Sequence, residues 1–348
     1  MGAKSSMAER DKIMKHLTKF GLIAGVTGAV IVKMAVRRSK FSFRNQSVLI
    51  TGGSRGLGLL IARLLAKEGA RLTIVGRDQK TLEAAQKELT SMGAAVRILP
   101  CDIRNRHEAE EAVQFAVREF GSIDVLINNA GIIQVGPLEH MRLQDFEDAI
   151  ATHAWAPLHT MLASIPHMRQ QGSGRIVNIS SIGGKIAVPH LGPYSMSKFA
   201  LAGLSDTMRT ELHKYRIYVT SVYPGLMRTG SHVNARFKGK HQEEYTWFSL
   251  MAALPAFSIN GQRAARQIID ACRAGMPELI ITTQAKLAVI ANAIFPNLTA
   301  RAMRIVNALL PQPLDTGDPH SRSGWASRSA LSPSLLTRLA DDCHSRKQ

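Results

Sequence analysis

Five consecutive residues in the second half of the chain combine a phenol, hydroxyls and an amine at a spacing suited to proton transfer. They read YSMSK, from Tyr194 to Lys198, and a further serine, Ser181, lies thirteen residues upstream of the tyrosine. Residues four apart share one face of a helix, so we expect the Lys198 ammonium near the Tyr194 phenol. A neighbouring cation favours the phenolate and lowers the phenol's pKa from its free value of about 10. We therefore predict that Tyr194 is a general acid–base residue and that Ser181 places a hydroxyl beside the same oxygen.

A glycine-rich turn near residue 50 argues against the alternative that YSMSK lies on an ordinary amphipathic helix. Residues 47–51 (SVLIT) have the pattern of a short buried strand, TGGSRGLG occupies 51–58, and residues 57–68 repeat apolar side chains at helical spacing. Glycines permit a tight turn, and the following helix N-terminus offers unpaired N–H groups to a pyrophosphate. The sequence therefore predicts a dinucleotide site in addition to the proton-transfer residues.

Short runs rich in valine and isoleucine alternate with helical patterns through the middle of the chain. The predicted strands are 71–75, 96–100, 123–128, 175–180 and 217–223, and helical segments such as 79–92 and 106–120 separate them. This alternation implies a parallel sheet covered by helices on both faces, with ligands bound at the carboxyl ends of the strands. We predict an α/β fold with a Rossmann-like, doubly wound parallel sheet.

Six landmarks occur in the order found in the short-chain dehydrogenase/reductase family, which the chain resembles from about Gln46 to Thr283. They are TGGSRGLG at 51–58, Cys101-Asp102, NNAG at 128–131, Ser181, YSMSK, and Pro224-Gly225 followed by Thr229. The resemblance implies hydride exchange between a nicotinamide and a carbonyl or secondary alcohol, with Ser181, Tyr194 and Lys198 as catalytic residues. Lys198 would also bind the nicotinamide ribose.

The resemblance also implies a set of cofactor-binding residues. Asp102 would contact the adenine ring, Asn128 and Gly131 would shape the pocket, and Thr229 would hold the nicotinamide carboxamide. The full set is Thr51, Gly52, Ser54, Arg55, Gly56, Leu57, Gly58, Arg77, Asp102, Ile103, Asn129, Ala130, Gly131, Tyr194, Lys198, Pro224, Gly225 and Thr229. We expect no metal ion, since the three cysteines have no metal-ligand spacing and reduced thiols are the default.

The second predicted strand ends in Val75-Gly76-Arg77, and this bears on the choice of cofactor. Enzymes that select NAD usually place an acidic side chain at this point, where it accepts hydrogen bonds from the ribose. A guanidinium instead binds a 2′-phosphate, and Arg55 adds a second cation. We therefore predict NADP(H) over NAD(H). The alternative is that Arg77 is merely solvated and that Asp78 turns back to the ribose.

One position departs from the family pattern. An asparagine is usual in the helix after NNAG, where it anchors a water in the proton relay behind the lysine. The corresponding residue is His153, in the stretch 151–157. A histidine can also hold a water or pass a proton. His153 is therefore either a fourth catalytic residue or a packing histidine with the relay rerouted.

Residues 20–32 are uncharged and apolar, and the apolar character resumes at 34–36 after Lys33. Three interpretations are open: a single-pass or interfacial membrane anchor, a cleaved secretory signal, and an ordinary helix packed on the domain. We favour the anchor, with the catalytic domain facing the cytoplasm where NADPH is supplied. The alternative localisation is cytoplasmic. Positive residues flank the segment on both sides: Lys12, Lys15, Lys19, Lys33, Arg37, Arg38 and Lys40.

The 348 residues are expected to hold one catalytic domain with extensions at both ends. The predicted divisions are an N-terminal segment (1–45), the catalytic domain (46–284), an amphipathic helical extension with a break at Pro296 (285–312), and a mostly disordered tail (313–348). The extension is expected to close over the substrate, lie on a membrane or pack on the core. The net charge of +18 is concentrated at the two ends, where it suits anionic lipids better than nucleic acid, and no nucleic-acid motif accompanies it.

The substrate is expected under the segment 226–259 that follows Pro224-Gly225. This segment carries apolar side chains, and Trp155 is expected to approach from below, so a hydrophobic carbonyl or alcohol is predicted. A catalytically idle NADP(H)-binding sensor or scaffold is the alternative function. The resemblance suggests a homodimer or homotetramer formed through the helices around Leu158 and Phe199. The apolar residues of the segment are Trp247, Phe248, Leu250, Met251 and Phe257.

Overall fold

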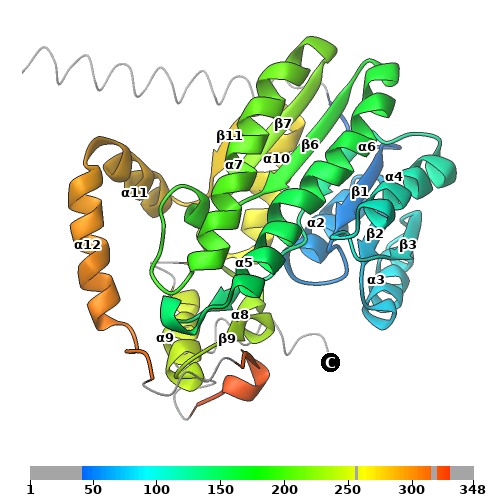
Figure 1. The fold of residues 1–348 in the computed structure, drawn as a ribbon. Coiled ribbons are helices and arrows are strands. Elements are labelled where there is room, and N and C mark those ends of the chain that lie inside the picture. The colour runs from blue at the N-terminus through cyan, green and yellow to red at the C-terminus, as the bar shows by residue number, and fades with distance from the viewer. Residues whose placement is uncertain (1–40, 255–257, 315–319, 330–348) are drawn as a thin grey trace, which may run out of the picture. The chain divides into compact units, whose positions relative to one another are not determined.

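The predicted strands are present and form one sheet. The computed structural model describes residues 41–254, 258–314 and 320–329 of the chain. Within these residues seven strands pair in parallel in the order β11-β7-β6-β4-β1-β2-β3 (Figure 1). Six of them agree with the predicted ranges to within two residues, and β11 is additional. Their bounds are β1 (Ser47–Thr51), β2 (Arg71–Gly76), β3 (Val96–Pro100), β4 (Val125–Asn128), β6 (Gly174–Ile179), β7 (Ile217–Tyr223) and β11 (Glu278–Ile280).

Helices cover both faces of this sheet, as the alternation of strands and helices predicts. α4, α6 and α7 lie on one face, and α2, α3 and α10 lie on the other (Figure 1). The doubly wound, Rossmann-like α/β fold is therefore confirmed. These helices and α5 have the bounds α2 (Gly56–Lys67), α3 (Gln79–Ser91), α4 (Arg106–Phe120), α5 (Leu143–Ile150), α6 (Ala156–Gln171), α7 (Gly192–Leu212) and α10 (Gly261–Ala274).

The central strands are nearly continuous apolar runs because both faces of the sheet are buried. All five residues of β1 are buried. On one face, Leu126 of β4 and Ile176 of β6 belong to the same apolar cluster as Val113 of α4 and Met161 of α6. This packing fixes the strands that carry the sequence motifs.

The strand order reverses between β1 and β4, and the reversal brings the motifs together. From β1 the chain adds β2 and β3 on one side, and then crosses back to add β4, β6, β7 and β11 on the other. Thr51 at the end of β1 pairs with Asn128 at the end of β4, which pairs in turn with Asn178 of β6. Ligands bind at such reversal points, outside the carboxyl ends of the strands. The glycine turn, NNAG and Ser181 therefore share one edge of the sheet.

Shorter elements lie beyond this edge (Figure 1). β8 and β10 pair in parallel, and β5, β9 and β12 form a second small sheet. Two helices, α8 and α9, follow β8 in the predicted substrate-covering segment. The bounds are β5 (Gln134–Val135), β8 (Leu226–Arg228), α8 (Ser231–Asn234), β9 (Arg236–Phe237), α9 (His241–Ala253), β10 (Ser258–Asn260) and β12 (Arg322–Ser323).

The expected disordered tail is not found at residues 320–329, because this stretch pairs with β9. β12 adds an antiparallel strand there. Gly324 N–H donates to the Ala235 carbonyl at 2.9 Å. A Cβ at Gly324 would collide with the backbone of His232 and Val233. A glycine inside a polar stretch thus allows a close backbone contact that composition alone did not reveal.

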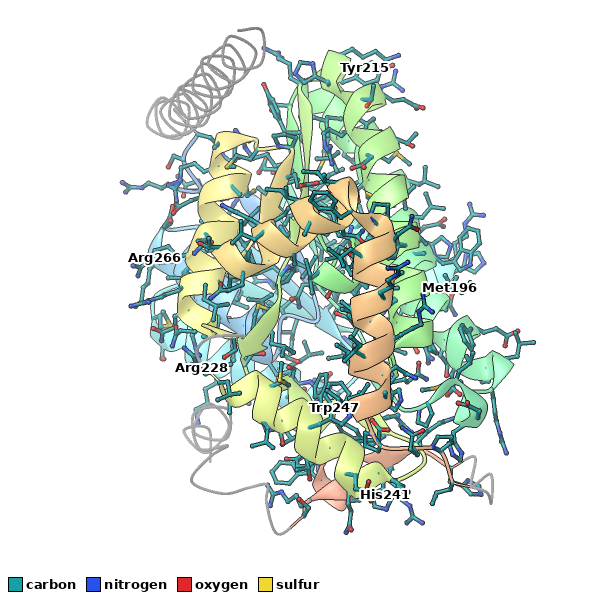
Figure 2. All side chains as sticks on the ribbon, turned by 90° about the vertical axis from the view of Figure 1, so that its left-hand side faces the viewer. Met196, Tyr215, Arg228, His241, Trp247 and Arg266 are labelled. Carbon is teal, nitrogen blue, oxygen red and sulfur yellow. The ribbon has the colours of Figure 1, made fainter. Side chains whose placement is uncertain are left out.

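The apolar extension forms two helices broken at Pro296, as predicted. They are α11 (Thr283–Ile294) and α12 (Pro296–Leu309). Figure 2 looks onto both helices, with Trp247 of α9 near the lower end of α12. Large apolar side chains stay exposed on this pair and its linker, namely Leu287, Ile290, Ile294, Phe295, Leu298, Ile305 and Leu309.

The apolar run at 20–36 lies outside the described residues, so its role as an anchor stays a prediction. In the three described stretches, no helix combines the length and the apolar character needed to span a bilayer. The division of the chain at 45, 284 and 312 also stays a prediction.

Candidate active site

The glycine turn joins β1 to α2 and leaves the first turn of α2 without a side-chain cap. Gly52 and Gly56 have left-handed backbone angles, with φ of 64° and 53°, which favour glycine. Arg55 occupies the capping position but makes no side-chain hydrogen bond to the helix, whereas Asp78 and Asn260 cap α3 and α10. Unpaired N–H groups at a helix N-terminus attract anions. The start of α2, including Leu57, therefore fits the pyrophosphate of a dinucleotide.

NNAG is hydrogen-bonded directly to the glycine turn. The Asn129 side-chain amide donates to the carbonyl oxygens of Thr51 and Gly52, both at 3.0 Å. Thr51 Oγ1 accepts the backbone N–H groups of Asn129 and Ala130, at 3.0 and 3.1 Å. Gly58 packs so closely against Gly52 and Asn129 that a Cβ has no room. The two loops therefore hold each other in place at the predicted cofactor site.

Two guanidinium groups lie close together at the end of β2. Arg77 is exposed immediately after the strand. Arg55 Nη1 donates to Asn234 Oδ1 at 2.8 Å, and burial together with the nearby Arg77 charge lowers the pKa of Arg55. Asp78 Oδ1 accepts the Thr81 N–H at 2.7 Å and so caps α3. Two cations thus lie where the ribose of the adenosine is expected, and the nearby carboxylate is engaged in capping.

Other predicted cofactor residues lie along the same edge. Ser54 Oγ accepts a hydrogen bond from Thr81 Oγ1 at 3.3 Å. Asp102 follows β3, and its hydrogen bond from Arg104 lowers the pKa of the carboxyl. Ile103 is buried beside it. These positions are compatible with contacts to an adenine.

Pro224, Gly225 and Thr229 follow β7 on the side of Ser181. The Pro224 carbonyl accepts the Ile182 N–H at 2.8 Å, which places this loop against the turn after Ser181. The Thr229 methyl group would lie 2.9 Å from a Cβ at Gly261, the first residue of α10. A Cβ at Gly56 of the glycine turn would lie 3.8 Å from the Thr229 carbonyl oxygen, so the loop reaches from Ser181 to the glycine turn.

Ser181 and Tyr194 are brought together, as their spacing predicts. Ser181 Oγ accepts the Gly183 N–H at 3.1 Å and caps a short 3₁₀ turn after β6. Tyr194 lies in the first turn of α7, partly buried, and its ring and Ser181 Oγ both border Gly183, where an added Cβ would lie 3.3 Å from the ring and 3.6 Å from the hydroxyl. Burial raises the pKa of the Tyr194 phenol, and the neighbouring Ser181 hydroxyl offsets only part of the rise. The expected lowering of this pKa by Lys198 is therefore wrong for this structure.

Lys198 does not lower the pKa of Tyr194 because of its own surroundings: it is buried behind the tyrosine ring. Its Nζ donates to the Ile179 carbonyl at 2.8 Å and lies 5.6 Å from the centroid of the Tyr194 ring. Burial lowers the pKa of Lys198 to about 7. An ammonium that is only partly charged at neutral pH stabilises a phenolate less than a full charge does.

His153 is buried in a π-helical turn, Ala151–Trp155, between α5 and α6. Its Nε2 accepts the Ile132 N–H at 3.1 Å, and its Nδ1 lies 2.7 Å from Ser197 Oγ. Burial and the Lys198 charge lower the pKa of His153 well below its ordinary value. Both ring nitrogens therefore contact protein groups, which favours the packing interpretation over the water-holding one.

Apolar side chains lie next to Tyr194. One cluster contains Phe237, Tyr245 and Phe248, and Tyr194 and Trp247 pack against it. Phe257 lies outside the described residues. Trp155, by contrast, does not approach from below: it is 53% exposed and stacks on His159 at 6.4 Å between ring centroids.

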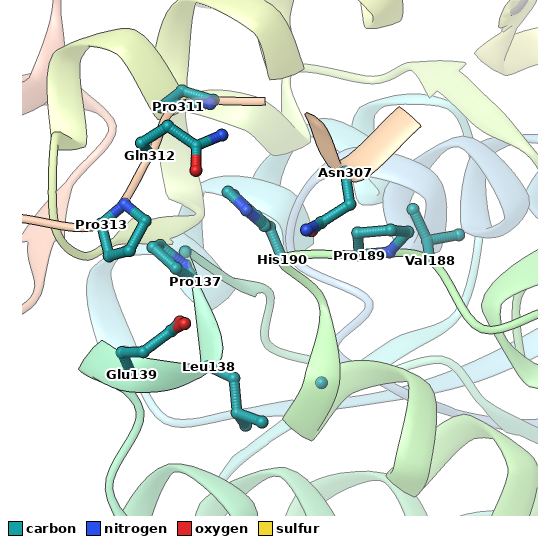
Figure 3. Close-up of a pocket in the computed structure, with 12 residues that line it drawn as sticks. Pro137, Leu138, Glu139, Val188, Pro189, His190, Asn307, Pro311, Gln312 and Pro313 are labelled. Carbon is teal, nitrogen blue, oxygen red and sulfur yellow. The ribbon is translucent and has the colours of Figure 1, made fainter. Parts of the chain in front are cut away.

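A cavity of about 350 Å³ lies between the segment 188–192 that precedes Tyr194, the segment 136–139 and the end of α12. Figure 3 shows His190 and Asn307 close together in this cavity, with Gln312 on one side and Glu139 below. The His190 Nδ1 lies 2.8 Å from Glu244 of α9, which also accepts a hydrogen bond from Trp247 at 2.6 Å. α9 and the loop before the tyrosine are thereby joined.

Two residues that shape the site were not identified from the sequence. Ser197, inside YSMSK, bonds His153 and donates to the Tyr194 carbonyl at 2.8 Å. Gly184 approaches the Lys198 backbone so closely that a Cβ would lie 2.7 Å from its carbonyl oxygen. Ser197 occupies a position that the motif leaves unspecified. Its role is revealed only by its partner His153, which lies in the turn before α6.

Comparisons with known proteins agree with this geometry. A family model described as short chain dehydrogenase matches residues 46–238. The ketoacyl reductase HetN of Nostoc is 39% identical over 192 residues, which are 55% of this chain and 67% of that protein. A 3-ketodihydrosphingosine reductase of Bacteroides thetaiotaomicron is 37% identical over 185 residues, covering 53% of this chain and 65% of that protein.

A solved structure agrees at the level of the fold. The crystal structure of levodione reductase has a TM-score of 0.63 at 24% identity, covering 70% of this chain and 99% of that one. The family match covers more than half of the chain and includes the glycine turn, NNAG, Ser181 and YSMSK. The chain therefore belongs to the short chain dehydrogenase family, and it is a nicotinamide-dependent oxidoreductase that acts on alcohol and carbonyl groups.

Proposed function

We propose that this chain interconverts a lipophilic carbonyl compound and its secondary alcohol with NADP(H), using Tyr194 as the general acid–base residue. When bound, the nicotinamide supplies or accepts the hydride. In reduction the Tyr194 hydroxyl donates its proton to the substrate oxygen, and in oxidation the phenolate takes that proton back. Ser181, whose Oγ accepts the Gly183 N–H and which lies beside Tyr194, would turn its hydroxyl hydrogen to the substrate oxygen once substrate is bound. Lys198 would bind the nicotinamide ribose.

The observation that carries this proposal is that Ser181 Oγ and the Tyr194 ring lie side by side, 3.6 and 3.3 Å from where a Cβ at Gly183 would be, with Lys198 buried behind the ring. A raised pKa keeps the phenol protonated at neutral pH, which is the form needed to donate a proton in reduction. The test is consumption of reduced nicotinamide with a panel of hydrophobic and small ketones, and formation of it with the matching alcohols. Absence of turnover with every compound would overturn the proposal.

The preference for NADP(H) is supported by the charges at the end of β2. Arg77 is exposed there, Arg55 lies within its electrostatic reach, and Asp78 is engaged in capping α3. One charge-assisted hydrogen bond contributes about 1.5–3 kcal/mol, or at least about tenfold in affinity. Calorimetric titration is therefore expected to give a Kd for NADPH at least about tenfold below that for NADH. Equal values would refute the preference while leaving the reaction class untouched.

A lipophilic substrate is supported by the aromatic cluster against Tyr194 and by the relatives named as ketoacyl and 3-ketodihydrosphingosine reductases. Each buried methylene contributes about 0.8 kcal/mol, or about fourfold in an equilibrium. We expect kcat/KM to rise by up to about this factor per methylene in a series of ketones of increasing chain length. A flat series would contradict a lipophilic substrate.

Membrane association through the N-terminal segment, with the catalytic domain facing the cytoplasm, is part of the proposal. It is supported by the uncharged run at 20–32 with lysines on both sides. The helices α11 and α12 also combine exposed apolar side chains with basic residues, namely Lys286, Arg301 and Arg304, a combination that suits a membrane surface. Deletion of residues 1–44 is expected to move the protein from the membrane fraction to the supernatant. An unchanged distribution would refute the anchor.

A homodimer or homotetramer formed through α6 and α7 is also proposed. Leu162 of α6 and Met196 and Phe199 of α7 are exposed by 53%, 53% and 44%, and Figure 2 places Met196 on the outer side of α7. Light scattering is expected to give a mass two or four times that of the chain, and Phe199→Glu should reduce it. A monomeric mass for the unaltered protein would overturn this assembly.

A further inference from the structure

We propose that His153 is a neutral positioning residue that fixes Tyr194 relative to the NNAG loop through Ser197, and that it carries no protons for the reaction. The inference rests on the proposed acid–base role of Tyr194. It assigns a function to the one position where the chain departs from the family pattern.

The proton positions follow from the partners of the imidazole. The Ile132 backbone N–H can only donate, so His153 Nε2, 3.1 Å away, must accept and carries no hydrogen. In a neutral imidazole the hydrogen then lies on Nδ1, which donates to Ser197 Oγ at 2.7 Å. Ser197 directs its own hydroxyl hydrogen to the Tyr194 carbonyl at 2.8 Å. Every donor in this series meets an acceptor, which leaves one consistent assignment.

The series connects two parts of the site that are far apart in the sequence. Ile132 directly follows NNAG, the loop bonded to the glycine turn, and Ser197 lies one helical turn after Tyr194 in α7. The His153 ring also meets the Tyr194 ring edge to face, with centroids 5.5 Å apart and planes at 87°. A Cβ at Gly131 would lie only 3.0 Å from His153 Nε2, so the loop has little freedom to move inward. The tyrosine is thereby held at a fixed place relative to the loop.

The same geometry argues against a proton relay through this residue. A relay needs a ring nitrogen that faces water or another titrating group, and both nitrogens of His153 are occupied. Protonation would also place an Nε2–H against the Ile132 N–H, so two donors would face each other. The titratable groups beside the ring are Tyr194 and Lys198, both of α7, while Ile132 and Gly131 on the other side bring no charge. The charge of Lys198 further opposes a second cation.

Two substitutions separate positioning from proton transfer. In His153→Gln the side-chain oxygen can still accept the Ile132 N–H, but the residue cannot titrate. In Ser197→Ala the link to the Tyr194 carbonyl is lost and His153 Nδ1–H has no acceptor. Ser205→Ala is the matched control: Ser205 is buried in the same helix, donates to the Leu201 carbonyl at 2.6 Å and accepts from Asn178 at 2.9 Å. It lies two helical turns further from the tyrosine.

Positioning predicts that Ser197→Ala lowers kcat by about tenfold, the effect of about 1.4 kcal/mol, with KM for the nicotinamide changed less than about twofold. His153→Gln should lower kcat without removing either limb of the pH–rate profile. The kcat of the variant that carries both His153→Gln and Ser197→Ala should be about equal to that of the less active single variant, because the two residues act in one series. Ser205→Ala should lower Tm but keep kcat. Wild-type kcat in Ser197→Ala, or a limb of the profile lost in His153→Gln, would overturn the proposal.

A readout that does not depend on turnover separates this inference from the proposed function. Nitrogen NMR of the full chain should show His153 as the Nδ1–H tautomer, with no titration between about pH 5 and 8. The Ile132 amide should exchange slowly in the unaltered protein and in Ser205→Ala, and faster in His153→Ala. A His153 that titrates in this range sinks the inference even if Tyr194→Phe is inactive. Full activity of Tyr194→Phe would instead overturn the proposed function.

Discussion

The Lys198 ammonium lies 5.6 Å from the centroid of the Tyr194 ring but donates its hydrogen bond to the Ile179 carbonyl. Burial raises the pKa of the phenol, and burial also lowers the pKa of the lysine to about 7. The proton therefore resides on the tyrosine at neutral pH.

Tyr194→Phe is expected to lower kcat by about 10² to 10⁴, the range typical of general acid–base help. The Kd for NADPH should change little, because the phenyl ring keeps its packing. The measurement is steady-state turnover together with fluorescence titration of the cofactor. Tyr215→Phe, at the opposite end of α7 from Tyr194 (Figure 2), is the control and should behave like the unaltered enzyme. Comparable activity in both variants would reject the assignment.

Lys198→Met is expected to abolish turnover and yet stabilise the cofactor-free protein. The folded-state pKa of this lysine, about 7, lies below its ordinary value of 10.5, so between these values the unfolded chain binds more protons. The stability of the unaltered protein should therefore rise with pH through this window, and the variant should lack that rise.

Thermal unfolding at several pH values measures this effect. At about 2–4 °C per kcal/mol, we expect Lys198→Met to raise Tm by roughly 5 °C at pH 7, with the gain shrinking toward pH 10. Lys185→Met is the contrasting control, because Lys185 is half-buried and forms an ion pair with Glu278 at 2.7 Å. It should show no such gain. A Tm difference for Lys198→Met that grows with pH would contradict the burial argument.

Arg77→Ala is expected to raise the Kd for NADPH by about tenfold or more and to leave the Kd for NADH within about twofold, since the lost contact is with the 2′-phosphate. Arg97 lies on β3, and its similarly exposed guanidinium pairs with Glu119 of α4, so Arg97→Ala should change neither Kd. Paired titrations of both variants with both cofactors provide the measurement. An equal loss for NADPH and NADH would show that Arg77 does not read the phosphate.

Gly58→Ala and Gly203→Ala form a matched pair. A methyl group at Gly58 has no room beside the Gly52 carbonyl and the Asn129 amide, so the glycine turn must shift. We expect a rise in the Kd for NADPH of more than about tenfold and a lower Tm. At Gly203, inside α7, an added Cβ meets nothing within 4 Å, and alanine should stabilise the helix by up to about 1 kcal/mol. Unchanged cofactor affinity in Gly58→Ala would refute the tight contact.

The fold could be predicted because its strands are buried on both faces. Runs such as Val48 to Ile50 are apolar throughout, and a glycine or an asparagine marks where β1, β2 and β4 end. β11 was not predicted because its three residues, Glu278–Ile280, begin with a charged residue and are only partly buried. β12 is shorter still and depends on the distant strand β9, so no local pattern identifies it.

The candidate site could be predicted in its residue types but not in its energetics. Spacing brings Ser181, Tyr194 and Lys198 together, yet it carries no information on burial, which reverses the expected direction of the tyrosine pKa. The two partners of His153 come from Ile132 and Ser197, residues that no motif specifies. Trp155 was expected at the substrate because it is aromatic, but its helix turns it outward onto His159.

The reversal of strand order between β1 and β4 has a consequence for how the protein acquires activity. Thr51 and Asn128 are 77 positions apart, and Tyr194 follows much later, so the edge that carries the site exists only once these distant segments have paired. Long-range pairing of this kind forms slowly compared with local helices. In a refolding experiment, helical signal should therefore return before turnover does, and recovered turnover is the stricter measure of a correctly assembled sheet.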